Sequence, residues 1–234
     1  MVSIRHIKHN WISLWSLELS SIALSRICLG LILIVDLLAR LSQVEVFYSV
    51  DGLAPPSLVK GSFPAVWNLY LLNDQLWYAK ALISLNLVCA LFWTVGYRGA
   101  WALVATWFLY ASLFYRNSFI HSGAEVTLLS ALFWMMWLPH SRKFSLDSKS
   151  GEQEAHPNVV SAGSVAYIGS IIIYYFFSGL NKSSPIWTSE GSALYYALNL
   201  DSLVSPAGVW LLSQSGTIQA LTLLIWWLEV LSPL

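Results

Sequence analysis

The stretch from Ser20 to Leu41, SSIALSRICLGLILIVDLLARL, decides the fold of this chain. A helix crosses the hydrocarbon core of a bilayer with roughly 20 mostly apolar residues, and this stretch has that length and character. Of all 234 residues, 57% are hydrophobic and 10% are charged, whereas soluble domains carry about 25% charged residues. The composition therefore predicts an integral membrane protein, and we expect it in the cell membrane as a multi-pass protein.

Five further apolar stretches follow the first, and each predicts another membrane-crossing helix. The six predicted spans are 20–41, 77–95, 99–115, 123–138, 163–180 and 216–234. We therefore predict an all-α, polytopic transmembrane helical bundle of about six spans. The sixth apolar run has no polar residues after it to anchor a helix end, which predicts that residues 1–234 are a membrane domain truncated at its C-terminus.

Basic residues suggest an orientation for this bundle. Residues 1–19 mix basic with aromatic and aliphatic side chains, which predicts an interfacial amphipathic segment. Lys and Arg accumulate on the cytoplasmic side of membrane proteins, so this segment and the basic cluster at 142–149 place the N-terminus in the cytoplasm. The net charge is zero, which argues against a nucleic-acid partner. No Cys/His spacing typical of a metal site is present, so we predict none.

Ionisable residues within the predicted spans need partners, because an unpaired charge in the bilayer is costly. Arg26 lies near the inner end of the first span, and Glu229 lies at a similar depth in the last. We predict that Arg26 and Glu229 form a structural ion pair, with binding of an anionic head group as the alternative. Asp36 and Arg40 are one helical turn apart and in a favourable order for pairing.

Polar side chains also gather at the predicted outer ends of three helices. Arg116 and Asn117 follow the third span, His121 and Glu125 begin the fourth, and Lys182 ends the fifth. A histidine at a helix start is often a cap or a core residue, and a lysine at a helix end is often only solvated. Convergence of several ionisable groups at one level is, however, also typical of a functional site.

Three stretches of the sequence resemble the HTTM domain, the membrane region shared by vitamin K-dependent gamma-carboxylases and their bacterial relatives. The first, 25–52, contains SRICLG and later FY and DG. The second, 115–139, contains YRN, HSGAE and WLP, and the third, 174–196, contains YYFFSG, the lysine, a tryptophan and a tyrosine pair. They cover most of the chain in the family's order, so the chain is similar to an HTTM domain from residue 1 to 234.

The resemblance assigns roles to individual residues. The family's base lysine, in a Gly-x-x-Lys-x-x-x-x-Trp setting, falls on Lys182 with Trp187 at the matching distance, although one extra residue precedes Gly191. The carboxylases also use a histidine, for which His121 is the candidate, with Glu125 as an orienting group. The resemblance places substrate binding on Trp187, Tyr195, Tyr196, Asn117 and Arg116.

The chemistry that the resemblance implies begins with a reduced naphthoquinone, vitamin K or another lipid quinol. A neutral lysine removes its proton, oxygen converts the quinol to an epoxide, and the strong base formed on the way allows carbon dioxide to add to a glutamate. The sequence has no counterpart of the soluble domain with which the carboxylases recognise their protein substrate. We therefore expect a lipid quinone as partner, besides the bilayer itself, and do not expect protein carboxylation from this chain.

Two other readings remain open. The first is a non-catalytic accessory membrane protein for maturation or export of a secreted peptide, as for the sporulation-delaying toxin maturation protein. It predicts that Lys182 is dispensable, whereas Trp187, Tyr195 and Tyr196 matter. The second is a thiosulfate–quinone oxidoreductase subunit of the DoxD type, for which the sequence offers no residue specific to sulfur chemistry.

Overall fold

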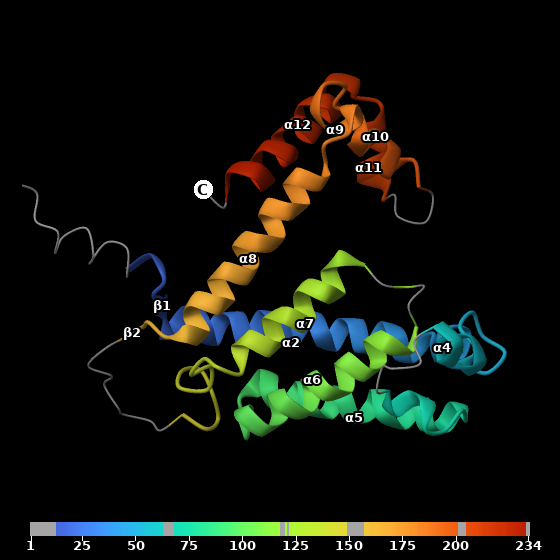
Figure 1. Cartoon of the computed structure of the whole chain (residues 1–234), viewed down its shortest axis with the longest axis vertical. Helices are drawn as coiled ribbons and strands as arrows, with labels where there is room; N and C mark the ends of the chain where they lie inside the picture. Colours follow the sequence, from blue (N-terminus) through green and yellow to red (C-terminus); the bar gives the residue numbers. More distant parts are fainter. Residues whose placement is uncertain are drawn as a thin grey trace, which may run out of the picture. The chain divides into compact units, whose positions relative to one another are not determined.

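The computed structural model describes residues 13–62, 68–117, 120, 122–148, 157–200 and 205–232. Helices form nearly all of its regular structure (Figure 1). The chain divides into two compact units, residues 1–168 and residues 169–234. The boundary falls inside one long helix, so that helix contributes to both.

The first unit contains the elements up to the first turns of α8. They are β1 (Leu17–Glu18), α2 (Leu19–Ser42), α3 (Val44–Tyr48), α4 (Pro56–Ser62), η1 (Leu69–Leu71), α5 (Leu76–Val95), α6 (Gly99–Arg116), α7 (Gly123–Met135), β2 (Asn158–Val159) and the start of α8 (Ala162–Asn181). The second unit contains the rest of α8 followed by α9 (Pro185–Thr188), α10 (Ala193–Leu198), α11 (Pro206–Leu212) and α12 (Ser215–Leu231).

The centre of the first unit is formed by α2, α5 and α6, with α2 and α6 both packed against α5. Leu33, Ile83 and Leu103, one from each helix, are completely buried. The sharp turn between α5 and α6 depends on Gly96, whose φ of 74° is a left-handed conformation that costs glycine little because it has no Cβ. This turn lets the two helices run back along each other.

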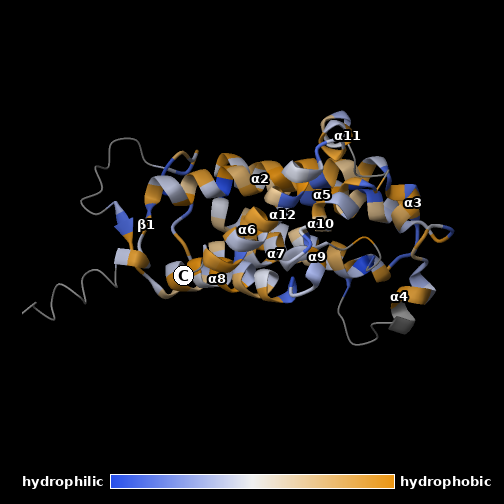
Figure 2. Ribbon diagram, turned by 90° about the horizontal axis from the view of Figure 1, so that it is seen from above, coloured by the Kyte–Doolittle hydropathy of each residue, from blue (hydrophilic) through white to orange (hydrophobic). Residues whose placement is uncertain are grey.

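The surface of the long helices is apolar, as a lipid environment requires. On α2, for example, Leu24 is 58% and Val35 is 67% exposed. Figure 2 shows hydrophobic residues along both α2 and α8. Exposed apolar surface of this extent is unusual for a soluble monomer, which supports a membrane protein.

The predicted helices lie where the sequence placed them, with bounds that differ by one to a few residues. Within the described residues, α2, α5 and α8 are long and apolar enough to cross a membrane. The pair α11 and α12, bent by 107°, would add a fourth crossing if it were one broken span, and α7 is a shorter apolar helix. The count of six spans and the cytoplasmic N-terminus therefore stay predictions.

A short antiparallel pair joins the starts of two helices in the first unit. Leu17 pairs with Val159 and Glu18 pairs with Asn158, and the backbone N–H of Leu19 donates to the carbonyl of Pro157 at 2.9 Å. Part of the predicted interfacial segment is thus a strand, because its backbone groups find partners in β2. Residues 1–12 of that segment lie outside the described residues.

Candidate functional site

Lys182 is part of a compact ion pair in the second unit. It follows directly after α8, and its Nζ lies 2.5 Å from both Oε1 and Oε2 of Glu229 in the last turn of α12. Ser178, one helical turn before Lys182, donates its hydroxyl to Oε2 of Glu229 at 3.0 Å. The side chains of Lys182 and Glu229 are 23% and 17% exposed. The pair is therefore mostly buried but remains partly accessible.

The aromatic ring predicted to accompany Lys182 is also in place. Nζ of Lys182 lies 4.7 Å from the ring centroid of Trp187 on α9, within the range of a cation–π contact. The extra residue before Gly191 is accommodated by a left-handed turn, with φ of 64° at Gly191. The backbone N–H of Ser192 then donates to the carbonyl of Ile186 at 2.8 Å, which closes the turn between α9 and α10.

Glycine allows α8 and α12 to approach each other at the ion pair. A Cβ on Gly179 would lie 2.7 Å from Cγ2 of Val230, the residue next to Glu229. Alongside this crossing the two helices leave a cavity of about 370 Å³ lined by Ile171, Ile172, Tyr175, Leu228 and Ser232. The cavity is mainly apolar. Leu228, one of its lining residues, directly precedes Glu229 on α12.

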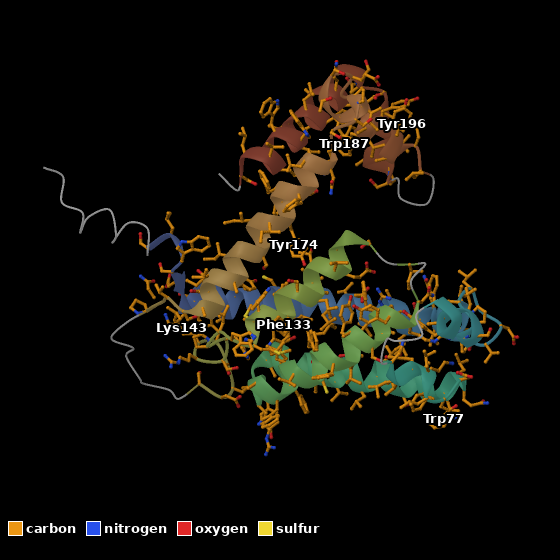
Figure 3. The ribbon with its side chains drawn as sticks, viewed as in Figure 1. Trp77, Phe133, Lys143, Tyr174, Trp187 and Tyr196 are labelled. Atoms are coloured by element: carbon orange, nitrogen blue, oxygen red, sulfur yellow. The ribbon has the colours of Figure 1, made fainter. Side chains whose placement is uncertain are left out.

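The two tyrosines predicted to bind substrate lie on α10 of the second unit, the helix after Trp187. Trp187 and Tyr196 are labelled in Figure 3. Tyr195 is 47% and Tyr196 is 57% exposed, and their rings contact each other edge to face at 5.8 Å. In the described part of the chain, no hydrogen bond or ring contact joins either tyrosine to Lys182. They form an exposed aromatic surface separate from the ion pair.

The first unit contains a second charged cluster, centred on Arg40 of α2. Its Nε donates to Oδ2 of Asp36 at 2.7 Å, and its Nη1 donates to the hydroxyl of Tyr48 at 2.8 Å. Its Nη2 donates to Oε1 of Glu125 on α7 at 2.7 Å. Tyr110 of α6 completes the cluster by donating its hydroxyl to Asp36 at 3.0 Å. We call these five residues the Arg40 cluster, and it links α2, α3, α6 and α7.

The family model of the HTTM domain matches residues 16–231, nearly the whole chain. The protein belongs to the HTTM family. Neither the curated proteins nor the solved structures contain a match to this chain. The resemblance inferred from the sequence is confirmed at the level of the family.

In this HTTM protein, Arg116 and Asn117 hold the chain between α3 and α4. Arg116 donates to the carbonyls of Ala54 and Tyr48 at 2.6 and 3.1 Å, and Asn117 donates to the carbonyl of Phe47 at 3.0 Å. Both side chains are buried. These hydrogen bonds serve the fold, and the predicted role of the two residues in substrate binding stays a prediction.

Glu125 was predicted to orient His121, and this role stays a prediction. In the structure Glu125 takes part in a capping box, in which its carboxylate accepts from the backbone N–H and the hydroxyl of Ser122 while it also pairs with Arg40. His121 lies outside the described residues. The carboxylate of Glu125 is thus already used by a helix cap and an arginine.

The predicted ion pair between Arg26 and Glu229 would join the two units, and it stays a prediction. The ionic partner of Glu229 is Lys182, whereas Arg26, which is fully buried in the first unit, donates to the backbone carbonyl of Phe144. Each side chain therefore has a partner within its own unit. The close approach of α8 and α12 at Gly179 brings Lys182 to Glu229.

Sequence reasoning missed the partnership of Ser178, Lys182 and Glu229 in this HTTM protein. One signal was available, because Ser178 and Lys182 are four residues apart and therefore share one face of a helix. The partner on α12 had no such local signal. Arg40 as the centre of a cluster was also missed, although its pairing with Asp36 was recognised.

Proposed function

We propose that this HTTM protein binds a lipid quinol at the second unit and that Lys182 is the base that takes the quinol's proton. One observation carries the proposal: Nζ of Lys182 lies 2.5 Å from both carboxylate oxygens of Glu229 and 4.7 Å from the ring of Trp187. Nζ of Lys182 donates to a carboxylate that is placed to take its proton, and an aromatic face lies beside it. Such an arrangement suits general base catalysis on a ring hydroxyl.

Glu229 has a specific task in this proposal. A lysine accepts a proton only as the neutral amine, and the carboxylate of Glu229 is within hydrogen-bond distance to take up the proton that Lys182 already carries. Ser178 fixes Oε2 of Glu229 from the neighbouring turn of α8. Glu229 and Ser178 are therefore positioning residues, and Lys182 is the group that touches the substrate.

The surroundings of the ion pair fit an amphipathic substrate. The apolar cavity between α8 and α12 is lined by Leu228, which precedes Glu229 in the sequence, together with Ser232 and Tyr175. It would take part of an apolar tail. The Trp187 ring offers a flat face for the aromatic head. When bound, the quinol supplies the reduced ring that one oxygen molecule converts to the epoxide with release of one water.

The test is an epoxidation assay with reduced naphthoquinone on membranes that contain the complete protein. Lys182→Ala should lower the rate by about 100-fold or more, because a positioned base contributes roughly 10²–10⁴. Glu229→Gln should lower it by less, because Glu229 positions the lysine and does not itself touch the substrate. Lys80→Ala is the matched control, since Lys80 is a more exposed lysine, paired with Glu45. Absence of epoxide from well-folded wild type, or equal rates in wild type and Lys182→Ala, would refute the proposal.

The accessory reading is the second candidate, and the exposed rings of Tyr195 and Tyr196 favour it. An aromatic pair on the surface of a short helix is a suitable contact for a secreted peptide. In that case Tyr195→Ala with Tyr196→Ala would abolish maturation of the peptide, whereas Lys182→Ala would leave it unchanged. The opposite pattern would favour the quinol-linked function.

A further inference from the structure

The loop after α7 is fastened onto the turn between α5 and α6. The backbone N–H groups of Leu146 and Asp147 donate to the carbonyls of Val95 and Gly96, each at 3.1 Å. In return, the backbone N–H of Gly99 donates to Oδ2 of Asp147 at 2.9 Å. The loop and the turn thus form one continuous surface at one end of the first unit.

Two large apolar side chains of this loop face outward in spite of that fastening. Phe144 is 64% exposed and Leu146 is 72% exposed. Phe144 has a φ of 49°, a left-handed conformation that is unfavourable for a bulky side chain. Its carbonyl is held by the buried guanidinium of Arg26, and the hydroxyl of Ser145 donates to the carbonyl of Gly96 at 2.8 Å. The fold therefore holds an apolar ring at the surface at a cost in backbone strain.

Exposed aromatic residues surround the loop. Tyr97 in the turn is 43% exposed, Trp101 in the first turn of α6 is 78% exposed, and Trp137 just beyond α7 is 65% exposed. Trp and Tyr concentrate where the hydrocarbon of a bilayer meets the head groups, because the ring is apolar and its N–H or O–H is polar. The rings at these helix ends match that boundary.

Basic side chains complete the surface. Arg98 in the turn and Arg142 in the loop are exposed. Lys143, which is labelled in Figure 3, is partly exposed. The carboxylate of this loop, Asp147, accepts from the backbone of Gly99. Within residues 96–101 and 137–147, three cationic side chains stand against one carboxylate, so this described part of the chain carries a net positive charge.

We propose that this surface, residues 96–101 with 137–147, binds anionic phospholipid at the membrane boundary, and we call it the lipid platform. Phe144 and Leu146 enter the acyl boundary, as apolar side chains of interfacial segments do. Arg98, Arg142 and Lys143 then meet the phosphates of the head groups. A soluble partner is less well matched, because the platform lies at the ends of the apolar helices α5 and α6.

The proposal is tested by measuring lipid binding to the complete purified protein in detergent. Phosphatidylglycerol and phosphatidylcholine are added at equal concentration, and bound lipid is counted by native mass spectrometry. Wild type should retain phosphatidylglycerol preferentially. Each lost cation should weaken its binding about fivefold, so the triple variant R98Q/R142Q/K143Q should lose about 100-fold. Lys80→Gln, a cation outside the platform, is the control and should bind as wild type does.

Additional variants test the apolar and the charged parts of the lipid platform separately. F144S/L146S should reduce retention of both lipids, because the apolar anchor is lost. If the triple variant does not fold, the single variants Arg142→Gln and Lys143→Gln provide the same test at fivefold each. Equal retention of the two lipids by wild type, unchanged phosphatidylglycerol binding in the variants, or full competition by the same concentration of inorganic phosphate would each overturn the proposal.

Discussion

Arg40 and Lys182 are both sheltered cations beside carboxylates, yet their surroundings differ. Arg40 is 8% exposed and gives one donor each to Asp36, Tyr48 and Glu125. Lys182 is 23% exposed, has the single carboxylate of Glu229, and turns its remaining side towards the ring of Trp187. The donors of Arg40 are directed at side chains on α2, α3 and α7. Lys182 is more exposed and can accept a further partner.

Arg40 therefore has the surroundings of a cation that holds helices together, whereas Lys182 has those expected of the proposed base. The planar guanidinium is always charged and binds several partners in fixed directions, which suits a clamp between helices. The lysine ammonium is a compact charge on a flexible stem that can gain and lose its proton. The Arg40 cluster is therefore expected to carry stability, and the Lys182 pair is expected to carry activity.

The largest stability effect should come from breaking the Arg40 cluster. Arg40→Met leaves Asp36 and Glu125 without their cation, and removing one partner of a buried ion pair typically costs about 3–5 kcal/mol. The loss is measured by thermal or denaturant unfolding of the protein in detergent. Arg40→Lys keeps the charge and should lose less. If Arg40→Met were no more destabilising than Lys182→Met, the distinction between the two cations would be wrong.

The free energy of unfolding should depend on pH through His140, a buried residue of the first unit. Burial, and then the nearby charge of Arg26, lowers the pKa of His140 from 6.5 to about 4. The unfolded chain binds more protons between these values, so this stabilisation is complete above pH 6.5 and is lost as the pH falls. From pH 7 to pH 5 the loss should be about 2 kcal/mol, seen in unfolding curves at both pH values. His140→Asn should lose distinctly less over that interval, and an equal loss would contradict the assignment.

Widening the α8–α12 crossing should affect activity more than stability. Gly179→Ala introduces a Cβ 2.7 Å from Val230, and a single extra methyl of this kind costs about 1 kcal/mol. Epoxidation should fall about tenfold or more, because small displacements of catalytic groups are costly. Gly169→Ala is the matched control, since nothing described lies within 4 Å of its added Cβ. Equal activity in both variants would show that the crossing does not position the pair.

The smallest stability change is expected at Lys182 itself. Lys182→Met removes one partly exposed ion pair and keeps the apolar stem, so the loss should stay below about 1 kcal/mol. Unfolding curves of this variant are compared with those of Lys80→Met. A loss as large as that of Arg40→Met would assign Lys182 to the fold and weaken its proposed role as a base.

The helices were predictable from the sequence because each depends on a local pattern. The predicted run 77–95 became α5, Leu76–Val95, and 163–180 became α8, Ala162–Asn181. Length and apolarity alone place such helices, and Gly96 marks the turn between two of them. The pairing of Asp36 with Arg40 was equally visible, since both lie on one helix face.

The long-range partners could not be predicted in the same way. Glu229 lies 47 residues from Lys182, and Glu125 lies 85 residues from Arg40. The sequence indicates how deep in the membrane each charged residue lies. It does not indicate which helices are neighbours, and this decides which charges form a pair. That choice rests on details such as the missing side chain of Gly179, whose effect appears only once α12 lies against α8.

The β1–β2 pair has a consequence for the order in which the chain is assembled. Val159 follows its partner Leu17 by 142 residues, and synthesis at about 5–20 residues per second takes roughly 7 to 28 s to cover that interval. During this time the start of α2 lacks its hydrogen-bonded neighbour. The pair can close only when β2, just before α8, has been made. It is therefore a late step of biogenesis, and disrupting it should slow maturation of the newly made chain more than it weakens the finished protein.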